Sequence, residues 1–217
     1  MKIGILGSGA VGKALTAGFI KYGYEVMAGS RSPEKLAEWQ KEISPDIQTG
    51  TFEKTASFGD LVILAVKGTV AEEVIQSMKS ETLTGKTVID TTNPIANTGP
   101  EKGVLSFFTN NNQSLMERLQ KRVPEAHFVK AFSSVGAHLM VDPEFEPGPT
   151  MFICGNNERA KTEVGEILWR FGWEVEDMGS AEAARAIEPL CILWCIPGFR
   201  ENNWNHAFKL LKLKEQK

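Results

Sequence analysis

A glycine-rich turn between an apolar strand and a helix constrains this chain more than any other feature of its sequence. The run Gly7-Ser8-Gly9-Ala10-Val11-Gly12 has the spacing G-x-G-x-x-G. An apolar segment, residues 2–7, leads into it, and a segment with helical periodicity, residues 10–22, follows it. In this context the first glycine allows a tight turn, the second lets a ligand approach the backbone, and the third lets the helix pack on the strand. The motif therefore predicts a unit that binds a dinucleotide, with the pyrophosphate at the helix N-terminus.

Segments typical of strands and of helices alternate along most of the chain. Residues 61–66, for example, form a continuous apolar run of the kind found in buried parallel strands. We expect strands at residues 2–7, 25–29, 49–52, 61–66, 86–91, 127–132, 150–154 and 174–177, helices at 10–22, from 32 onward, at 69–78, 114–122 and 158–171, and an irregular loop at 93–112. This alternation predicts an α/β fold, a Rossmann-type doubly wound and mostly parallel sheet with helices on both faces.

The C-terminal part departs from this alternation. Residues 180–213 have helical character, and Pro197-Gly198 predicts a break between two helices. We therefore expect a Rossmann-type domain with extra strands over residues 1–178 and a small C-terminal helical extension over residues 179–217. Within the extension we expect Arg185 and Glu188, three residues apart, to pair on one helix face. The alternative is that they fix the C-terminal helices against the cofactor.

Composition and charge argue against several classes of function. With 217 residues and a formal net charge of −3, the chain gives no electrostatic reason to expect nucleic acid as a partner. The apolar stretch at the N-terminus is too short for a signal peptide, and the longest apolar stretch, residues 187–199, is shorter than the ~20 residues that span a bilayer. We expect a cytoplasmic protein with no membrane partner.

The three cysteines, Cys154, Cys191 and Cys195, allow two interpretations. Cys191 and Cys195 are four residues apart, so a helix would place them on one face, where they could form a metal or redox pair. However, no third ligand lies near them in the sequence, and the residues around them are apolar. We expect small buried thiols in a reducing compartment and no metal site.

The end of the second expected strand indicates which dinucleotide binds. Enzymes that use NAD usually place an acidic residue there, about 20 residues after the glycine motif, to bind the ribose hydroxyls. This chain has Gly29-Ser30-Arg31 instead, with Lys35 one helical turn later. A hydroxyl and two cations suit the 2′-phosphate of NADP, which an acid would repel. The alternative is that Arg31 and Lys35 are only solvated charges, although cations are unfavourable at a helix start.

The later strand ends predict the remainder of the site, because ligands of doubly wound sheets lie beyond the carboxyl ends of the strands. Asn93 is placed to bind the nicotinamide carboxamide or the ribose. His138 is the one plausible acid among three histidines, with a structural role as the alternative. Small residues beyond the sixth strand would let two flat rings stack. The expected substrate pocket consists of Phe132, Ser133, Ser134, Gly136 and Ala137, with Trp194 and Pro197 from the tail.

Beyond these predictions, several segments of the chain resemble one known family. They include Gly29-Ser30-Arg31, Leu64-Ala65-Val66, Asp90-Thr91-Thr92-Asn93-Pro94, Val129-Lys130-Ala131-Phe132, Met151-Phe152-Ile153-Cys154-Gly155 and Ala184-Arg185-Ala186-Ile187-Glu188-Pro189-Leu190. Over essentially its whole length the chain is similar to the NADP oxidoreductases that depend on the deazaflavin coenzyme factor 420. That family includes archaeal deazaflavin:NADP oxidoreductases and the cytosolic domain of the STEAP metalloreductases.

The resemblance implies hydride transfer between NADP(H) and a deazaflavin or flavin. It also places Ser8, Ser30, Arg31 and Lys35 around the 2′-phosphate. The chain departs from the archaeal pattern in the long loop after Thr92-Asn93-Pro94-Ile95 and in the tail, residues 194–199. The complete set of expected cofactor-binding residues is Gly7, Ser8, Gly9, Ala10, Val11, Gly12, Ser30, Arg31, Lys35, Ala65, Val66, Lys67, Asn93 and Pro94.

Three functions are consistent with these expectations. The first is an NADP-dependent oxidoreductase acting on a deazaflavin or flavin, in which aligned rings matter more than an acid or base. The second is an NADPH-dependent reductase of a small carbonyl or imine. That class usually has a large helical second domain, and this chain has only a short tail. The third is an NADP-binding sensor without catalysis.

The tail also predicts self-association. Residues 189–197 are apolar on all sides of a helix, and such a helix must bury more than one face. A second copy around a twofold axis is the simplest cover, which predicts a homodimer with Trp194 near the interface and part of each substrate pocket formed by the tail. The alternative is burial within one subunit by a last helix over residues 203–213.

Overall fold

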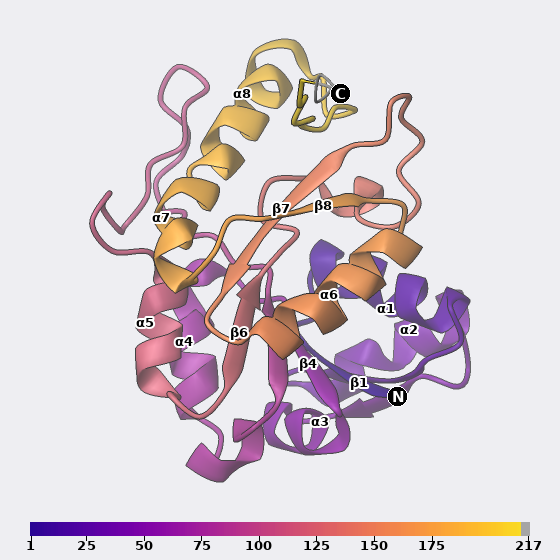
Figure 1. The fold of residues 1–217 in the computed structure, drawn as a ribbon. Helices are drawn as coiled ribbons and strands as arrows, with labels where there is room; N and C mark the ends of the chain where they lie inside the picture. Colours follow the sequence, from indigo (N-terminus) through magenta and orange to yellow (C-terminus); the bar gives the residue numbers. More distant parts are fainter. Residues whose placement is uncertain (214–217) are drawn as a thin grey trace.

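The computed structural model describes residues 1–213, and over that range the strands form one eight-stranded sheet (Figure 1). The strands are β1 (Lys2–Leu6), β2 (Glu25–Gly29), β3 (Gln48–Gly50), β4 (Leu61–Leu64), β5 (Thr87–Asp90), β6 (His127–Lys130), β7 (Thr150–Gly155) and β8 (Glu174–Asp177). Their order is β3-β2-β1-β4-β5-β6-β7-β8, and the first six are parallel. β7 runs antiparallel to β6, and β8 runs parallel to β7. The predicted doubly wound, mostly parallel fold is confirmed.

The α-helices follow the strands in the expected alternation. They are α1 (Ala10–Lys21), α2 (Ala37–Glu42), α3 (Phe52–Phe58), α4 (Gly68–Gln76), α5 (Leu115–Arg122), α6 (Glu158–Arg170), α7 (Ala184–Ile187) and α8 (Leu190–Glu201). Short 3-10 helices cover Pro33–Leu36, Ser80–Leu83, Ala137–Leu139 and Ala181–Ala183. None of the helices within residues 1–213 is both long and apolar enough to cross a membrane.

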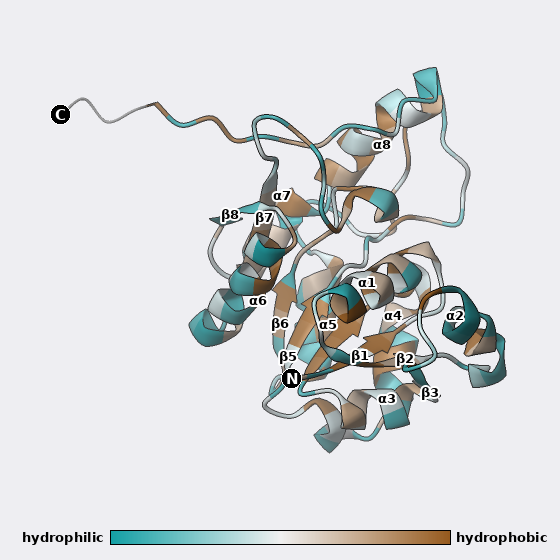
Figure 2. Cartoon of the chain, turned by 90° about the vertical axis from the view of Figure 1, so that its right-hand side faces the viewer, coloured by the Kyte–Doolittle hydropathy of each residue, from teal (hydrophilic) through white to brown (hydrophobic). Residues whose placement is uncertain are grey.

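Both faces of the sheet are buried under helices, as a parallel sheet requires. Alternate residues of β4 point to opposite faces: Ile63 packs with α1 and α6, whereas Val62 packs with α4 and α5. The strands accordingly lie in the hydrophobic centre of the molecule, and the helices turn hydrophilic faces outward (Figure 2). The strand ends are therefore the parts of the sheet left for binding a ligand.

The third predicted strand is too long at its C-terminal end. It ends at Gly50, and Phe52 instead begins helix α3, which the sequence analysis did not predict. The Thr51 side chain caps that helix by accepting a hydrogen bond from the Lys54 N–H. A threonine N-cap satisfies one of the free N–H groups at a helix start. This local bond explains why the chain turns into a helix at this point.

The predicted break at Pro197-Gly198 is wrong, because α8 continues through it to Glu201. A proline inside a helix removes one backbone hydrogen bond. Here the Trp204 ring covers the helix at that point, so closely that a Cβ on Gly198 would lie 2.3 Å from the ring. We infer that this packing offsets the missing bond. The helix ends instead at Asn202, which adopts the left-handed conformation that asparagine tolerates.

The predicted last helix is also wrong, because residues 203–213 form an irregular tail. Its carbonyl groups bind partners outside the tail. The His206 carbonyl accepts a bond from Trp194 Nε1 at 2.8 Å, and the Phe208 carbonyl accepts one from the Thr150 N–H, also at 2.8 Å. Carbonyls used in this way do not receive the bonds from residues four positions later that a helix needs.

Candidate functional site

The three glycines of the turn have different structural roles. Gly7 has a φ of +142°, and a Cβ there would lie 2.0 Å from the Ala65 carbonyl oxygen. A Cβ on Gly12 would lie 2.4 Å from the Gly7 carbonyl oxygen. A Cβ on Gly9 would meet nothing within 4 Å. Gly7 and Gly12 are thus required by the packing of the protein, whereas Gly9 leaves open space in front of the backbone. That space adjoins the N-terminus of α1, whose first amide groups have no carbonyl partner within the helix.

Two adjoining cavities form one groove across the carboxyl ends of the strands. Their volumes are about 420 Å³ and about 630 Å³. Both are lined by Gly9, Ala65, Val66 and Lys67, so they meet at the glycine turn. The smaller, outer cavity extends toward the end of β2, and the larger, inner cavity extends toward the end of β5.

The outer cavity carries the cations that the sequence analysis selected. Ser30, Arg31 and Lys35 all line it. Neither Arg31 nor Lys35 has an ion-pair partner within the part of the chain that the structure describes. These unpaired cations leave the end of β2 suited to an anionic group such as a phosphate.

Packing explains why β2 ends in Gly29 and not in an acid. A Cβ on Gly29 would lie 2.7 Å from Oγ1 of Thr55, a fully buried residue of α3. A side chain at position 29 would therefore have to displace α3. One acid, Glu73 of α4, does line the outer cavity.

Asn93 lines the inner cavity, and only one of its two polar side-chain atoms has a hydrogen-bond partner among the described residues. Its Nδ2 donates to the Ser133 carbonyl at 2.7 Å, whereas its Oδ1 is buried and has no partner among the described residues. A buried acceptor without a donor is unfavourable, so this oxygen suits a ligand that brings an N–H group. The nicotinamide carboxamide is such a group. Among the residues that line this cavity, Lys67 is the one titratable side chain.

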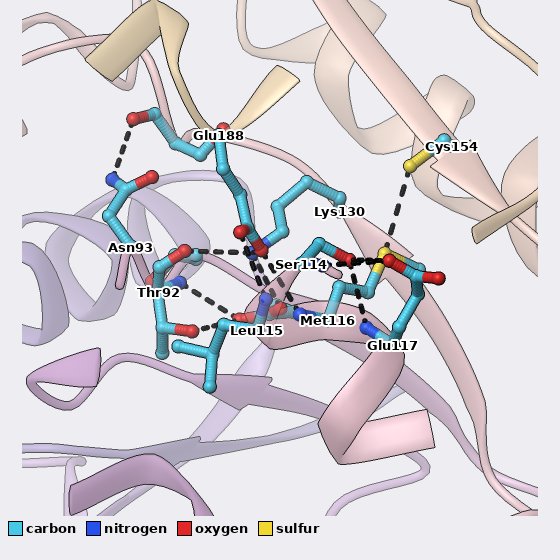
Figure 3. A network of polar contacts seen from close by, with 12 residues as sticks. Thr92, Asn93, Ser114, Leu115, Met116, Glu117, Lys130, Cys154 and Glu188 are labelled. Carbon is cyan, nitrogen blue, oxygen red and sulfur yellow. Dashed lines mark hydrogen bonds and ion pairs between the residues drawn. The ribbon is translucent and has the colours of Figure 1, made fainter. Parts of the chain in front are cut away.

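A buried ionic network includes Thr92, the residue before Asn93 (Figure 3). The fully buried Lys130 ammonium is 2.7 Å from Asp90 Oδ2 and 3.0 Å from Glu188 Oε1, and it donates to the Thr92 carbonyl at 2.7 Å. Burial alone would lower the pKa of Lys130, but the two carboxylates outweigh burial and hold that pKa above its usual range. The ammonium therefore stays charged, between two carboxylates and one backbone carbonyl.

The expected pair of Arg185 and Glu188 is wrong. Glu188 points inward to Lys130, and Arg185 instead donates to both oxygens of Glu117 on α5. This bond, against a weaker effect of burial, lowers the pKa of Glu117 to about 2. Helical spacing identified two residues on one helix face, but it could not show that each had a partner on another element.

The groove collects most of the expected cofactor-binding residues. Twelve of them line it: Gly7, Ser8, Ser30, Arg31 and Lys35 the outer cavity, Ala10, Val11 and Asn93 the inner one, and Gly9, Ala65, Val66 and Lys67 both. Gly12 and Pro94 line neither cavity. Gly12 acts through helix packing, and Pro94 is buried. A cationic outer end, an open glycine turn and an unpartnered amide oxygen together fit a phosphorylated dinucleotide.

Four of the seven expected substrate-pocket residues are buried, namely Phe132, Ser133, Ser134 and Trp194. Phe132 has a φ of +60° and packs in the core against Phe171. Trp194 is buried, and a Cβ on Gly136 would lie 2.7 Å from its ring. None of the seven residues, Phe132, Ser133, Ser134, Gly136, Ala137, Trp194 and Pro197, lines either cavity of the groove.

His138 lies outside the groove and is exposed. Its Nε2 is 3.0 Å from Asn205 Oδ1 in the tail. This contact gives the ring a structural partner and does not bring it to Asn93. Its suggested role as an acid stays a prediction.

Several groove residues escaped the sequence analysis. Phe52, at the start of α3, and Val70, Glu73 and Val74, along α4, line the outer cavity, and Thr69, Thr91 and Ile95 to Gly99 line the inner one. Thr51, an N-cap residue, was the signal that could have placed Phe52 on a helix beside the glycine turn. The loop residues carry no comparable signal, because an irregular loop has no periodicity.

Comparison with known proteins agrees with this geometry. Residues 2–94 match a family model described as NADP oxidoreductase, coenzyme F420-dependent. An F420-dependent NADP reductase from Methanocaldococcus jannaschii is 30% identical over 88% of this chain and 89% of its own length. The chain belongs to this family. A crystal structure from Arthrobacter sp. FB24, assigned as an F420-dependent NADP reductase, superposes with a TM-score of 0.91 at 30% identity, over 98% of this chain and 100% of that one.

The family also relates the chain to larger proteins. Metalloreductase STEAP3 from Rattus norvegicus is 32% identical over 90% of this chain, but the match covers only 38% of the relative. The chain thus spans little more than a third of that metalloreductase. Membership in the family identifies an NADP-dependent oxidoreductase, and the second substrate is a separate question.

Substituting Gly9 separates ligand binding from folding. Gly9→Val should abolish NADPH binding while the melting temperature stays near that of the native protein, because Gly9 lines the groove and a Cβ there has no protein atom within 4 Å. Gly165→Val on α6, where a Cβ has only an ordinary contact at 3.9 Å, is the matched control and should bind NADPH normally. Calorimetric titration and thermal melting measure both effects. Normal NADPH binding by Gly9→Val would place the dinucleotide elsewhere.

Proposed function

We propose that this family member transfers a hydride between NADP(H) and a deazaflavin or flavin. The observation that carries the proposal is the chemistry of the inner cavity, where Lys67 is the one titratable residue among those lining it. Reduction of a carbonyl needs a proton donor at the reacting oxygen. Hydride transfer between two aligned rings needs position and exclusion of water more than an acid or base. The name of the archaeal relative supports the same partner.

The residues of the groove would hold the dinucleotide along its length. The open backbone at Gly9 and the N-terminus of α1 would bind the pyrophosphate. Ser30, Arg31 and Lys35 would bind the 2′-phosphate, and Asn93 Oδ1 would accept a hydrogen bond from the carboxamide. When bound, NADPH supplies the hydride. The protein supplies orientation, because Asn93 is itself fixed by its bond to the Ser133 carbonyl.

The second ring would stack beyond Asn93, toward the ends of β6 and α8. Ser133 Oγ is buried there without a partner in the described chain, which leaves a polar atom for that ring. The residues first selected for this pocket would then act mainly as its walls and support; they are Phe132, Ser133, Ser134, Gly136, Ala137, Trp194 and Pro197. We also propose that residues 179–217 form an extension of the domain over residues 1–178, and that the protein works in the reducing cytoplasm, because its three cysteines are buried and free.

Turnover assays test the hydride partner. NADPH oxidation should be fast with coenzyme F420 or with flavin mononucleotide, and at least a hundredfold slower with a panel of small aldehydes, ketones and cyclic imines. Absorbance of NADPH measures the rate, and each acceptor is tested with and without protein. Turnover restricted to a carbonyl or imine would replace the proposal by a small-molecule reductase. Tight NADPH binding without turnover of any acceptor would favour a sensor.

Arg31 should determine cofactor choice. Charge-assisted hydrogen bonds contribute roughly 1.5–3 kcal/mol and ~1.4 kcal/mol is tenfold in affinity, so Arg31→Ala should weaken NADPH binding roughly ten- to a hundredfold. Affinity for NADH should barely change, because NADH has no 2′-phosphate. Arg159→Ala, an exposed arginine on α6, controls for the loss of a positive charge. Equal affinities of the native protein for NADPH and NADH would contradict the assignment of this end of the groove.

We further propose a homodimer, supported by the apolar surface that α8 leaves uncovered. The tail covers Trp194, whose ring stacks on His206 at 5.0 Å, but Leu193 is 54% exposed and Phe199 is 43% exposed. Val104, on the loop beside α8, is 43% exposed. A second copy of α8 would cover this surface. The interface would thus involve Leu193 and Phe199 more directly than Trp194.

Light scattering tests this assembly. The native protein should have twice the chain mass of 23.9 kDa at micromolar concentration, and the double variant Leu193→Glu/Phe199→Glu should have the chain mass alone. Trp169→Glu is the matched control, because Trp169 is 76% exposed on α6, far along the chain from α8. This variant should remain a dimer. A native protein that is monomeric under these conditions would remove the dimer.

A further inference from the structure

The loop between β5 and α5 forms one wall of the inner cavity. Asn93, Ile95, Ala96, Asn97, Thr98 and Gly99 line that cavity. Further along, Leu105 and Phe107 pack against Cys191, Trp194 and Cys195 of α8. The loop therefore contacts both the cavity and α8, and Figure 1 shows it beside that helix. Apart from isolated bridges, it has no regular secondary structure to hold its shape.

The first end of the loop is fixed by two groups of the ionic network. Asp90 Oδ1 accepts hydrogen bonds from the Thr92 N–H at 2.9 Å and from the Thr92 hydroxyl at 2.6 Å. Lys130 Nζ donates to the Thr92 carbonyl at 2.7 Å. The backbone immediately before Asn93 is thus held on both sides of Thr92. This restraint sets the direction in which the Asn93 side chain leaves the sheet.

The second end of the loop is fixed by the third group of the same network. Glu188 accepts hydrogen bonds from the N–H groups of Leu115 and Met116, each at 3.0 Å, at the N-terminus of α5. Its Oε1 also faces Lys130 at 3.0 Å. The positive end of the helix stabilises this carboxylate. Figure 3 shows Thr92, Lys130, Glu188 and the start of α5 gathered around one point.

We propose that Lys130 is a positioning residue, whose buried charge holds both ends of the loop between β5 and α5. It lines neither cavity of the groove, and its side chain is fully buried, so it acts through Thr92 and Asn93 and not by contact with a ligand. Asp90 and Glu188 carry two negative charges in a buried region, and without the ammonium they would repel each other. Lys130 thus determines whether the start and the end of the loop stay together.

This inference rests on the proposed function, because it assigns the inner cavity to the nicotinamide half of NADP. It predicts an effect limited to that half. Lys130 has no described contact with Ser30, Arg31 or Lys35, which line the outer cavity. Loosening the loop should therefore weaken binding of the whole dinucleotide and leave binding of its adenosine 2′,5′-bisphosphate half unchanged.

The experiment compares Lys130→Met with Lys161→Met. Lys161 is a matched control, because it is also buried and paired with two carboxylates, Glu158 and Asp177, but it lies on α6 and does not line the groove. Calorimetric titration measures the affinities of both variants for NADPH and for adenosine 2′,5′-bisphosphate. Hydrogen exchange of residues 93–113 reports on the loop itself.

For Lys130→Met we expect NADPH binding to weaken about tenfold, since one neutral hydrogen bond to the carboxamide is lost on average. Binding of adenosine 2′,5′-bisphosphate should stay within twofold of native, and exchange in residues 93–113 should quicken. Lys161→Met should match the native protein in all three measurements. In turnover, the KM for NADPH should rise more than kcat falls.

Four other results are informative. A native protein that binds neither ligand would refute the proposed function itself. Native NADPH affinity in Lys130→Met, or equal loss of both ligands, would overturn the positioning role while leaving the proposed function intact. If Lys130→Met fails to fold, Glu188→Gln decides, because it releases the end of the loop and leaves Lys130 paired with Asp90. This variant should lose affinity for NADPH selectively, and native affinity would overturn the role.

Discussion

The burial of both sheet faces is the constraint on which the rest of this structure depends. Helices cover each side of β1 and β4 to β6, so no polar group can be presented from a face without being cut off from water. Chemistry is thereby confined to the ends of the strands. The glycine turn, the unpaired cations after β2 and the half-engaged Asn93 all lie there and together form one groove. The helices on both faces of the sheet therefore determine where the site lies, whatever its functional residues are.

The features predicted from the sequence are those with local causes. Apolar runs identified the strands, and a glycine spacing identified the turn and its ligand class. Ser30, Arg31 and Lys35 were selected because they come directly after β2 in place of an acid, and all three line the outer cavity. Each of these signals is contained in a dozen residues or fewer. Parallel strands have their carboxyl ends at the same edge of the sheet. The turn and the residues after each strand are therefore brought to that edge together.

The features that could not be predicted depend on contacts between distant segments. Glu188 looked like half of a helical pair, but its partner, Lys130, is 58 positions earlier on β6. Proline usually ends a helix, but α8 continues because Trp204 covers Gly198. The tail is irregular because its carbonyls bind Trp194 and Thr150. No pattern within a single segment contains these partners, so they appear only when the chain is folded.

The close contact between Gly29 and Thr55 has a consequence for changing cofactor choice. Thr55 belongs to α3, and its buried side chain fills the space that a side chain at position 29 would need. Exclusion of an acid from that position is therefore a property of the scaffold as well as of the binding surface. To place an acid at position 29 for the unphosphorylated dinucleotide, one would first have to change α3, with a residue smaller than threonine at position 55. The packing of α3 against β2 thus restricts which residues position 29 can carry, although α3 itself need not touch a ligand there.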